Sequence, residues 1–315
     1  MRSDDRALAL SIKRNILNYS NNVAPLPGVV APGSLDTFVF QIIESIRRVR
    51  FVTVVASRPL SAMRLDPSSE LFDPIRAAIL YRRAGNLDEA AWLVFLFTHF
   101  GKNLKSGYQL LRDVYGCLGH NYKVWSWEST SNDVFGFKQW LSKNNSNLKA
   151  YNNIHRAFGN HRKYQSLDAW KANGTGSAIE SYIKWVKNAG NHEALFNLAL
   201  SQSRYDTKIA FRLLFQQMKA VDSFGRTAKF DYLTMIGKTG LADIKPDSVH
   251  LMGATGPLNG AKMLFFGRTN VDVSTKTVEQ SADQLAEFIG IGSQEMEDSL
   301  CNWQKSPTHP RRFRG

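Results

Sequence analysis

A glycine turn followed by acidic residues is the part of this sequence that could carry chemistry. In the segment 222–257 a tight turn holds Gly225, an amphipathic helix is expected to begin at Arg226, and a loop then brings Asp247 ahead of an apolar stretch. A carboxylate can stabilise positive charge that develops on a sugar, and it can orient water. The P-loop, the dinucleotide-binding glycine fingerprint, HExxH and GxSxG are missing from the sequence, which excludes the enzyme classes that they mark.

The segment resembles the core of helix-hairpin-helix DNA glycosylases, in which a glycine turn, a basic residue and Thr-Ala precede a catalytic aspartate. Here Gly225-Arg226-Thr227-Ala228 precedes Asp247 at a slightly longer spacing. The resemblance implies that the hairpin binds a DNA phosphate and that Asp247 lies beside the deoxyribose of a flipped nucleotide. Asp243 is the alternative carboxylate, because the loop length decides which acid reaches the sugar. The residues of the hairpin expected to bind DNA are Gly225, Arg226, Thr227, Lys229 and Lys238.

Lyase chemistry is not expected from this hairpin. Bifunctional glycosylases place a lysine one residue after the arginine, whereas this chain has Thr227 there and Lys229 further along. Water is then the expected nucleophile rather than an amine. The resemblance therefore implies a monofunctional enzyme.

A second resemblance covers residues from about 75 to 266. Five strings are similar to the alpha-glutamyl/putrescinyl thymine pyrophosphorylase clade: FLFTHFGKN, HRKYQSL, GTGSAIESY, FGRTAKFDYLTMIGK and GATGPLNGAKMLF. The clade is considered glycosylase-derived and is tied to hypermodified bases of phage DNA. Some relatives look like defence glycosylases that excise such bases, glucosylated hydroxymethylcytosine among them.

Three functions follow from these resemblances. The first is a DNA glycosylase that flips and excises a hypermodified base from phage DNA, leaves an abasic site and so acts in antiviral defence. The second is a transferase that replaces an activated group on hydroxymethyluracil in DNA with an amine. The third is a DNA-binding module without catalysis, which would show salt-sensitive binding and no change of the base.

A base pocket is expected from polar residues at the end of an apolar helix. His99, Lys102 and Asn103 follow the most apolar stretch of the chain, and Thr255 lies near enough to Asp247 in sequence to shape the same pocket. The other interpretation of His99 is a core histidine near a helix C-terminus, where cations are favoured.

A phosphate clamp is expected at His161, Arg162 and Lys163, which stand beside the ring of Tyr164. A solvated charge cluster is the alternative. Gly174-Thr175-Gly176 could expose backbone donors at a helix start. Asp231 is expected to be a structural partner of a nearby Lys or Arg.

The stretch 125–140 is rich in aromatic residues. They are expected to be mostly core, although one of them could be the wedge that fills the space left by a flipped base. The residues are Trp125, Trp127, Phe135, Phe137 and Trp140.

Composition favours a polyanionic partner. Forty Lys and Arg against 27 Asp and Glu give a formal net charge of +13, and nucleic acid is the commonest polyanion. Cys117 and Cys301 are far apart, which excludes a disulfide scaffold, a zinc ribbon and a cysteine-ligated cluster. We expect no metal and no other cofactor, DNA as the partner, no membrane, no obligate protein partner and a cytoplasmic location.

The hydrophobic periodicity predicts an all-α fold of the helix-hairpin-helix glycosylase type, with a cleft between two helical lobes. Three regions are expected: a helical extension over 1–72, a glycosylase-like domain over 73–290 with the hairpin and catalytic loop at 220–257, and a basic tail over 291–315. The last residues, PTHPRRFRG, suggest a mobile end or a phosphate-binding arm. Helices are predicted at 6–20, 37–49, 74–83, 89–100, 104–115, 133–143, 147–157, 176–189, 191–202, 205–219, 225–238, 255–264 and 278–288.

Overall fold

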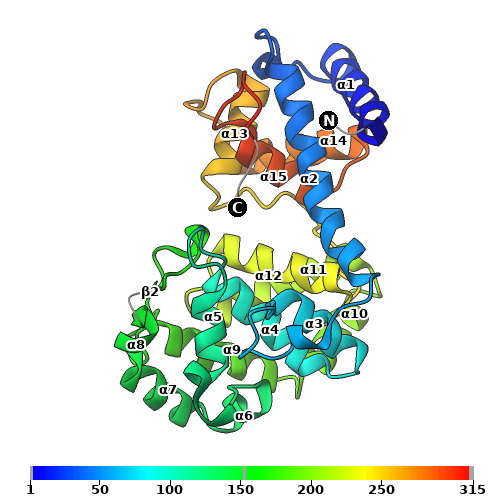
Figure 1. Cartoon of the computed structure of the whole chain (residues 1–315). Helices are drawn as coiled ribbons and strands as arrows, with labels where there is room; N and C mark the ends of the chain where they lie inside the picture. Colours follow the sequence, from blue (N-terminus) through cyan, green and yellow to red (C-terminus); the bar gives the residue numbers. More distant parts are fainter. Residues whose placement is uncertain (1–2, 152–153, 312–315) are drawn as a thin grey trace. The chain divides into compact units, whose positions relative to one another are not determined.

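The structure is a computed structural model that describes residues 3–151 and 154–311, and these residues form an α-dominant fold (Figure 1). The prediction of an all-α fold class is confirmed, since the described strands are two residues long and form a single antiparallel pair. The α-helices are α1 Ser3–Asn22, α2 Ser34–Ala56, α3 Pro74–Arg83, α4 Leu87–Phe100, α5 Gln109–Tyr115, α6 Trp127–Asn132, α7 Val134–Lys143, α8 Asn145–Lys149, α9 Thr175–Lys187, α10 His192–Gln202, α11 Thr207–Gln217, α12 Arg226–Thr239, α13 Gly256–Phe266, α14 Thr275–Ile289 and α15 Ser293–Trp303. The strands are β1 Ala150–Tyr151 and β2 Ile154–His155, and the short 3-10 helices are η1 Pro27–Val29, η2 Ala62–Arg64, η3 Cys117–Tyr122, η4 Asn160–Arg162 and η5 Met218–Ala220.

The chain divides into two compact units. The outer unit consists of the described residues of 1–53 and 246–314, and the inserted unit consists of those of 54–245. The predicted domain division at residues 72 and 290 stays a prediction. The two compact units are bounded instead at residues 53/54 and 245/246.

The outer unit buries a core between helices from both ends of the chain. Figure 1 shows α1 and α2 grouped with α13, α14 and α15. Ile16 of α1, Phe38 of α2 and Leu285 of α14 are completely buried in this core. Gly260 allows α13 and α15 to pack closely, because a Cβ atom there would lie 2.2 Å from the carbonyl oxygen of Leu300.

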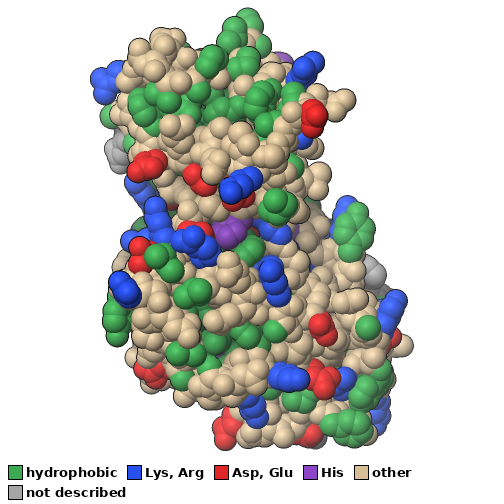
Figure 2. All heavy atoms as spheres, turned by 180° about the vertical axis from the view of Figure 1, so that it is seen from behind, with side chains coloured by type: hydrophobic (Ala, Val, Ile, Leu, Met, Phe, Trp, Pro, Cys, Tyr) green, Lys and Arg blue, Asp and Glu red, His purple; other side chains and the backbone are tan. Residues whose placement is uncertain are grey.

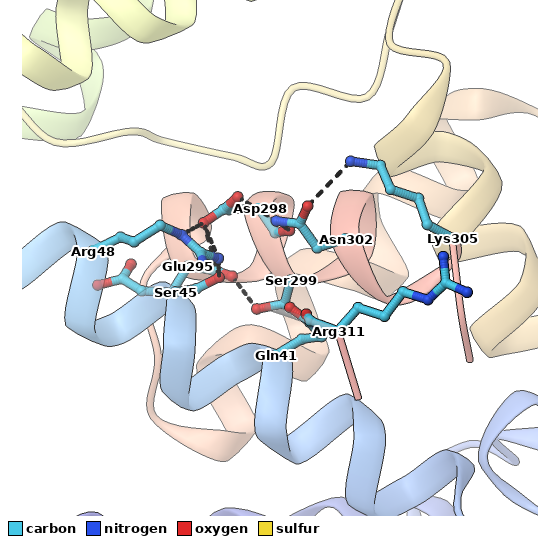
Figure 3. A network of polar contacts seen from close by, with 9 residues as sticks. All are labelled: Gln41, Ser45, Arg48, Glu295, Asp298, Ser299, Asn302, Lys305 and Arg311. Carbon is cyan, nitrogen blue, oxygen red and sulfur yellow. Dashed lines mark hydrogen bonds and ion pairs between the residues drawn. The ribbon is translucent and has the colours of Figure 1, made fainter. Parts of the chain in front are cut away.

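A polar network joins α2 to α15 in the outer unit (Figure 3). The Asp298 carboxylate accepts hydrogen bonds from Ser45 Oγ and Arg48 Nε, both at 2.9 Å, and from Asn302 Nδ2 at 2.8 Å. Because Ser45 is completely buried, its hydroxyl needs such a partner. The network fixes the position of α15 along α2.

The inserted unit is built around α4, whose residues are apolar on nearly every face. Trp92 and Phe95 are completely buried, and the Phe95 ring stacks on Tyr182 of α9 with centroids 3.8 Å apart. Helices α3, α12 and α10 also pack against α4. A helix that is apolar all round must be covered on all sides, and this explains why α4 lies at the centre of the unit.

Three predicted features differ from the structure. The helix predicted at 147–157 is wrong, since α8 ends at Lys149 and the β1–β2 pair follows. The helix predicted at 104–115 begins only at Gln109, because Asn103 and Gly107 pair their backbones in a turn. Asp88 directly precedes the predicted helix 89–100, where it would be expected as the N-cap, but Asn86 caps α4 instead, with its side chain accepting from the backbone N–H of Glu89.

The segment after residue 290 contains α15, which the sequence analysis did not predict. Met296, Leu300 and Trp303 of α15 are completely buried. Their spacing of four and three residues is that of a helix face packed on a core. The predicted arm 307–315 lies partly outside the described residues, which end at Arg311.

Candidate nucleic-acid interface and active-site residues

The predicted hairpin is present in the inserted unit as α11, η5, a turn over 221–225 and α12. Gly225 is the N-cap of α12 and supplies no side-chain cap, and a Cβ atom there would meet nothing within 4 Å. The first backbone N–H groups of a helix have no partner within the helix, and together with the helix dipole they attract anions. The turn therefore offers an open approach to groups suited to a phosphate.

The turn is held in place by neighbouring segments. Ser223 adopts a positive φ of 61°, its Oγ donates to the carbonyl of Asn173 at 2.6 Å, and its own carbonyl accepts from Gln165 Nε2 at 3.3 Å. The Asp222 N–H donates to Ser181 Oγ of α9 at 2.9 Å. These bonds order the turn before any ligand arrives, which lowers the entropic cost of binding.

The cations of the hairpin divide into two groups. Arg226 lies over the Phe230 ring at 4.7 Å, and Lys229 lies over the Phe215 ring at 4.5 Å. The pKa of Lys229 is lowered by burial and by the nearby charge of Lys219. Lys238 belongs to the last turn of α12, and at 1.5 Å per residue it stands roughly 18 Å along the axis from Arg226. The structure thus groups Arg226, exposed Thr227 and Lys229 at the turn and separates Lys238 from them.

A basic pocket of about 440 Å³ lies on the same inserted unit. It brings together Asn103 and Lys163, which the sequence analysis assigned to a base pocket and a phosphate clamp. The pocket has three cationic side chains and no acidic one among its lining residues, and its volume falls within the range of ligand sites. The lining residues are Asn103, Leu110, Lys149, Arg156, Ala157, Phe158, Asn160, Lys163, Gln165, Ser166 and Leu167.

Two residues shape this basic pocket from within. Arg156 is 6% exposed and forms an ion pair with Asp113 of α5. The side-chain oxygen Oδ1 of Asn103 accepts from the backbone N–H of Lys105 at 2.9 Å, and its side-chain amide Nδ2 donates to the carbonyl of Phe158 at 3.0 Å. Asn103 therefore orders the pocket wall. Lys102 is directed elsewhere, over the ring of Tyr108 at 5.5 Å.

Arg162 is placed inside the protein rather than at its surface. Its side chain is 7% exposed, Nε donates to the carbonyl of Thr98 at 2.7 Å, and Nη2 pairs with Asp231 at 2.7 Å. This pair agrees with the expected structural role of Asp231. Arg162 joins the end of α4 to α12, whereas its neighbours His161 and Lys163 are exposed. Of the three predicted clamp residues, these two present their side chains to solvent.

His99 occupies an aromatic core. It is 1% exposed and its ring is parallel to those of Phe95 and Phe224, with centroids 6.0 and 6.2 Å away. Its Nε2 lies 3.0 Å from the Thr175 hydroxyl, which donates its own hydrogen to the carbonyl of Ser166 at 2.7 Å. Nε2 must therefore carry the proton, and Nδ1 is buried without a hydrogen-bond partner. Burial, and then the charge of Arg162, lower the pKa of His99 to about 3.

Asp247 and its loop belong to the outer unit. One oxygen of Asp247 lies 2.8 Å from Nε2 of His250, and the side chain of Asp247 is 15% exposed. The loop is fastened to α14, since the Val249 N–H donates to Asp283 at 2.9 Å and Ser248 Oγ donates to Glu279 at 3.4 Å. His250 has a φ of 48°, in the sparsely populated left-handed region, and these bonds hold it there.

The other two predicted residues near this loop are exposed. Asp243 belongs to the inserted unit, on the far side of the Lys245–Pro246 boundary from Asp247. Thr255 is the N-cap of α13 but makes no side-chain cap bond. The structure therefore gives only one of the two candidate carboxylates, Asp247, a partly buried setting with a histidine partner.

The family of the chain follows from comparison with known proteins. Residues 33–315 match the family model described as alpha-glutamyl/putrescinyl thymine pyrophosphorylase clade 3. The chain belongs to this family. The resemblance drawn from the five strings is thereby confirmed, and the family description implies an enzyme that acts on modified thymine. No curated protein and no solved structure gives a significant match.

The charge of this clade 3 protein is dispersed on the face drawn in Figure 2, where Lys and Arg side chains alternate with Asp, Glu and apolar groups. Among the described residues no group of three or more His, Cys, Asp or Glu could hold a metal ion, and no helix is long and apolar enough to cross a membrane. On this face Figure 2 shows no single broad basic patch.

Sequence analysis missed a buried polar chain in the inserted unit. His192 is completely buried, with Nδ1 2.5 Å from Asp88 and Nε2 2.7 Å from the Tyr182 hydroxyl. The Tyr182 hydroxyl is in turn 2.9 Å from that of Tyr232. Burial lowers the pKa of His192 despite the nearby Asp88 carboxylate. Asp88 also lines a second pocket together with Glu89 and Glu128, whose acids make it unsuited to phosphate.

Proposed function

We propose that this clade 3 protein excises a hypermodified pyrimidine from phage DNA by hydrolysing the N-glycosidic bond, as an antiviral glycosylase. The observation that carries the proposal is the Asp247–His250 pair. A carboxylate that is partly buried and oriented by a histidine in an ordered loop can stabilise positive charge at a sugar. Asp247 is also the acid that the resemblance to helix-hairpin-helix glycosylases assigns to catalysis.

In the proposed reaction the bond between C1′ of the deoxyribose and the base nitrogen breaks, and its electron pair leaves with the base. The carbon that remains has oxocarbenium character, which Asp247 stabilises through its charge. A water oxygen then bonds to C1′ and loses a proton, the departing base takes up a proton on its nitrogen, and the products are the free base and an abasic site. The pair with His250 fixes the carboxylate in one orientation, which reduces the reorganisation needed in the transition state.

DNA binding in this proposal belongs to the inserted unit. The N–H groups at the start of α12 bind a backbone phosphate, with Arg226 and Lys229 beside them. The basic pocket adds Lys149, Arg156 and Lys163. Contacts of this kind position DNA in any sequence, and their strength falls as the salt concentration rises.

The test is incubation of the protein with phage DNA that carries modified pyrimidines, followed by alkaline cleavage and mass spectrometry of bases and nucleosides. Wild type should release a free base and leave alkali-labile sites. Asp247→Asn should slow base release about 100-fold or more, whereas the matched variant Asp243→Asn should be near wild type. Base release by Asp247→Asn at the wild-type rate would contradict the proposal.

A second function, group transfer, is favoured by the basic pocket and by the family description. There an amine nitrogen bonds to the exocyclic CH₂ carbon of a modified uracil, the bond from that carbon to a pyrophosphate oxygen breaks, and pyrophosphate leaves with the electron pair. Lysines and an arginine suit such a leaving group. The same mass spectra separate the two functions, because transfer gives an amine-substituted nucleoside in intact DNA and no free base.

A further inference from the structure

An exposed pair of aromatic rings lies beside the basic pocket of the inserted unit. Phe135 of α7 is 62% exposed and Trp170 is 51% exposed, and their ring centroids are 5.7 Å apart. The other four aromatic residues of the stretch 125–140 are buried or half-buried. Large rings exposed together cost solvation free energy, so such a pair indicates an interaction surface.

The backbone that carries Trp170 is rigid. One carboxylate oxygen of Asp168 accepts from the N–H groups of Trp170 and Lys171, both at 2.8 Å. The turn is also pressed against the start of α9, since a Cβ atom on Gly176 would lie 2.0 Å from the carbonyl oxygen of Ala169. An exposed ring on an ordered turn is preorganised for contact, because little conformational entropy is lost when a partner binds.

One cation contacts the aromatic pair, and others lie near the turn that carries it. Lys138 Nζ lies 4.8 Å from the centre of the Trp170 ring and is also paired with Glu180 at 2.6 Å. The backbone N–H groups of Trp170 and Lys171 lower the pKa of Asp168, and the charges of Lys171 and Lys149 lower it further. Lys149 also lines the basic pocket. The pocket and the pair are thus connected by cations and by the short segment from Leu167 to Trp170.

We infer that Phe135 and Trp170 form a stacking platform for unpaired bases of single-stranded DNA, with the phosphates passing over Lys149, Lys163 and Lys171. Interleaved cations and exposed aromatic rings are the combination that binds single strands without sequence preference, because every base has a face that can stack. The inference rests on the proposed action on DNA but not on which reaction follows. It assigns a preference for unpaired DNA around the target base.

The test is fluorescence anisotropy with two labelled oligonucleotides of equal length, a thymidine homopolymer and a strand whose central residues are abasic. The two strands carry the same phosphates, so the difference between the protein's affinities for them measures the contribution of the bases. Wild type should bind the thymidine strand about 5- to 100-fold more tightly. Trp170→Ala and Phe135→Ala should reduce this ratio towards one and leave the affinity for the abasic strand unchanged.

Matched variants keep the test independent of folding. Trp170→Tyr retains a ring and should retain most of the preference, whereas Trp170→Leu retains apolar area and should lose it. Phe51→Ala removes another exposed ring, 58% exposed on α2, and should behave as wild type. Asp247→Asn should bind like wild type whether or not base excision is found, which separates a failure of the platform from a failure of the proposed reaction.

Three results would overturn the inference. The first is equal affinity of wild type for the two strands. The second is an equal loss of affinity for both strands in Trp170→Ala. The third is sedimentation that shows wild-type dimers and Trp170→Ala monomers with unchanged DNA binding, which would make the pair a contact between copies of the chain.

Discussion

The buried histidine of α4 leads to a quantitative prediction about pH. His99 is neutral in the folded protein because its ring is buried against Phe95 and Phe224 and because Arg162 adds positive charge nearby. In the unfolded chain the same imidazole has a pKa near 6.5, against about 3 in the folded state. The unfolded state therefore binds a proton first as the pH falls, and the folded state becomes less stable below pH 6.5.

The magnitude follows from the difference between the two pKa values. One pH unit between them corresponds to about 1.4 kcal/mol of unfolding free energy. From pH 7 to pH 5 the His99 contribution should fall by about 2 kcal/mol, and it should continue to fall until pH approaches 3. No part of this loss is expected above pH 7, where the imidazole is neutral in both states.

The assay is urea unfolding at pH 7 and pH 5 for wild type and His99→Gln. Glutamine keeps an N–H donor for Thr175 and does not titrate. Between pH 7 and pH 5 the unfolding free energy of the variant should therefore fall by about 2 kcal/mol less than that of wild type. His192 contributes equally to both proteins and cancels in the difference. His309→Gln, at an exposed histidine, is the control and should follow wild type. An equal fall in the unfolding free energy of wild type and His99→Gln would refute the assignment of His99 to the buried core.

Two further predictions concern stability. Asp113→Asn should lower the unfolding free energy by about 3 kcal/mol in urea titrations, since it leaves the Arg156 guanidinium buried without its carboxylate; a change below 1 kcal/mol would show that solvent reaches Arg156. Gly260→Ala should lower the melting temperature sharply because its Cβ would collide with the carbonyl of Leu300, whereas Gly225→Ala, with open space at the same position, should cost about 1 kcal/mol at most. Similar melting temperatures for these two glycine variants would contradict the close packing of α13 on α15.

Local signals in the sequence were sufficient for most helices. Asp73 followed by Pro74 predicts the first residue of α3, and the structure places an N-cap at Asp73 whose side chain accepts from Arg76 N–H. Residues Gly225 to Ala228 likewise predicted the start of α12 to within one residue. In both cases the determining interactions lie within one helical turn.

The errors lie where distant residues decide the structure. Asp88 looks like a helix cap, but its carboxylate accepts from His192 instead, a hundred residues further on. The polar network of Asp298 and the burial of Trp303 on α2 make α15 a core helix, and no local signal reveals these partners.

In the candidate site, too, features set by neighbouring residues could be predicted and features set by distant residues could not. The hairpin could be recognised from consecutive residues, and Asp247 stays a predicted catalyst. The pairing of Asp247 with His250 could have been suspected from a spacing of three residues. The Phe135–Trp170 pair could not, because nothing local joins these two positions.

The outer unit is assembled from both ends of the described chain, and this has a consequence for biosynthesis. During translation α1 and α2 emerge first, yet the helices that cover their apolar faces are made only after residues 54–245 have left the ribosome. The inserted unit can fold in that interval, because domains fold as units while synthesis continues. Until then Ile16 and Phe38 stay uncovered, and nascent chains halted before residue 256 should recruit chaperones through these two helices.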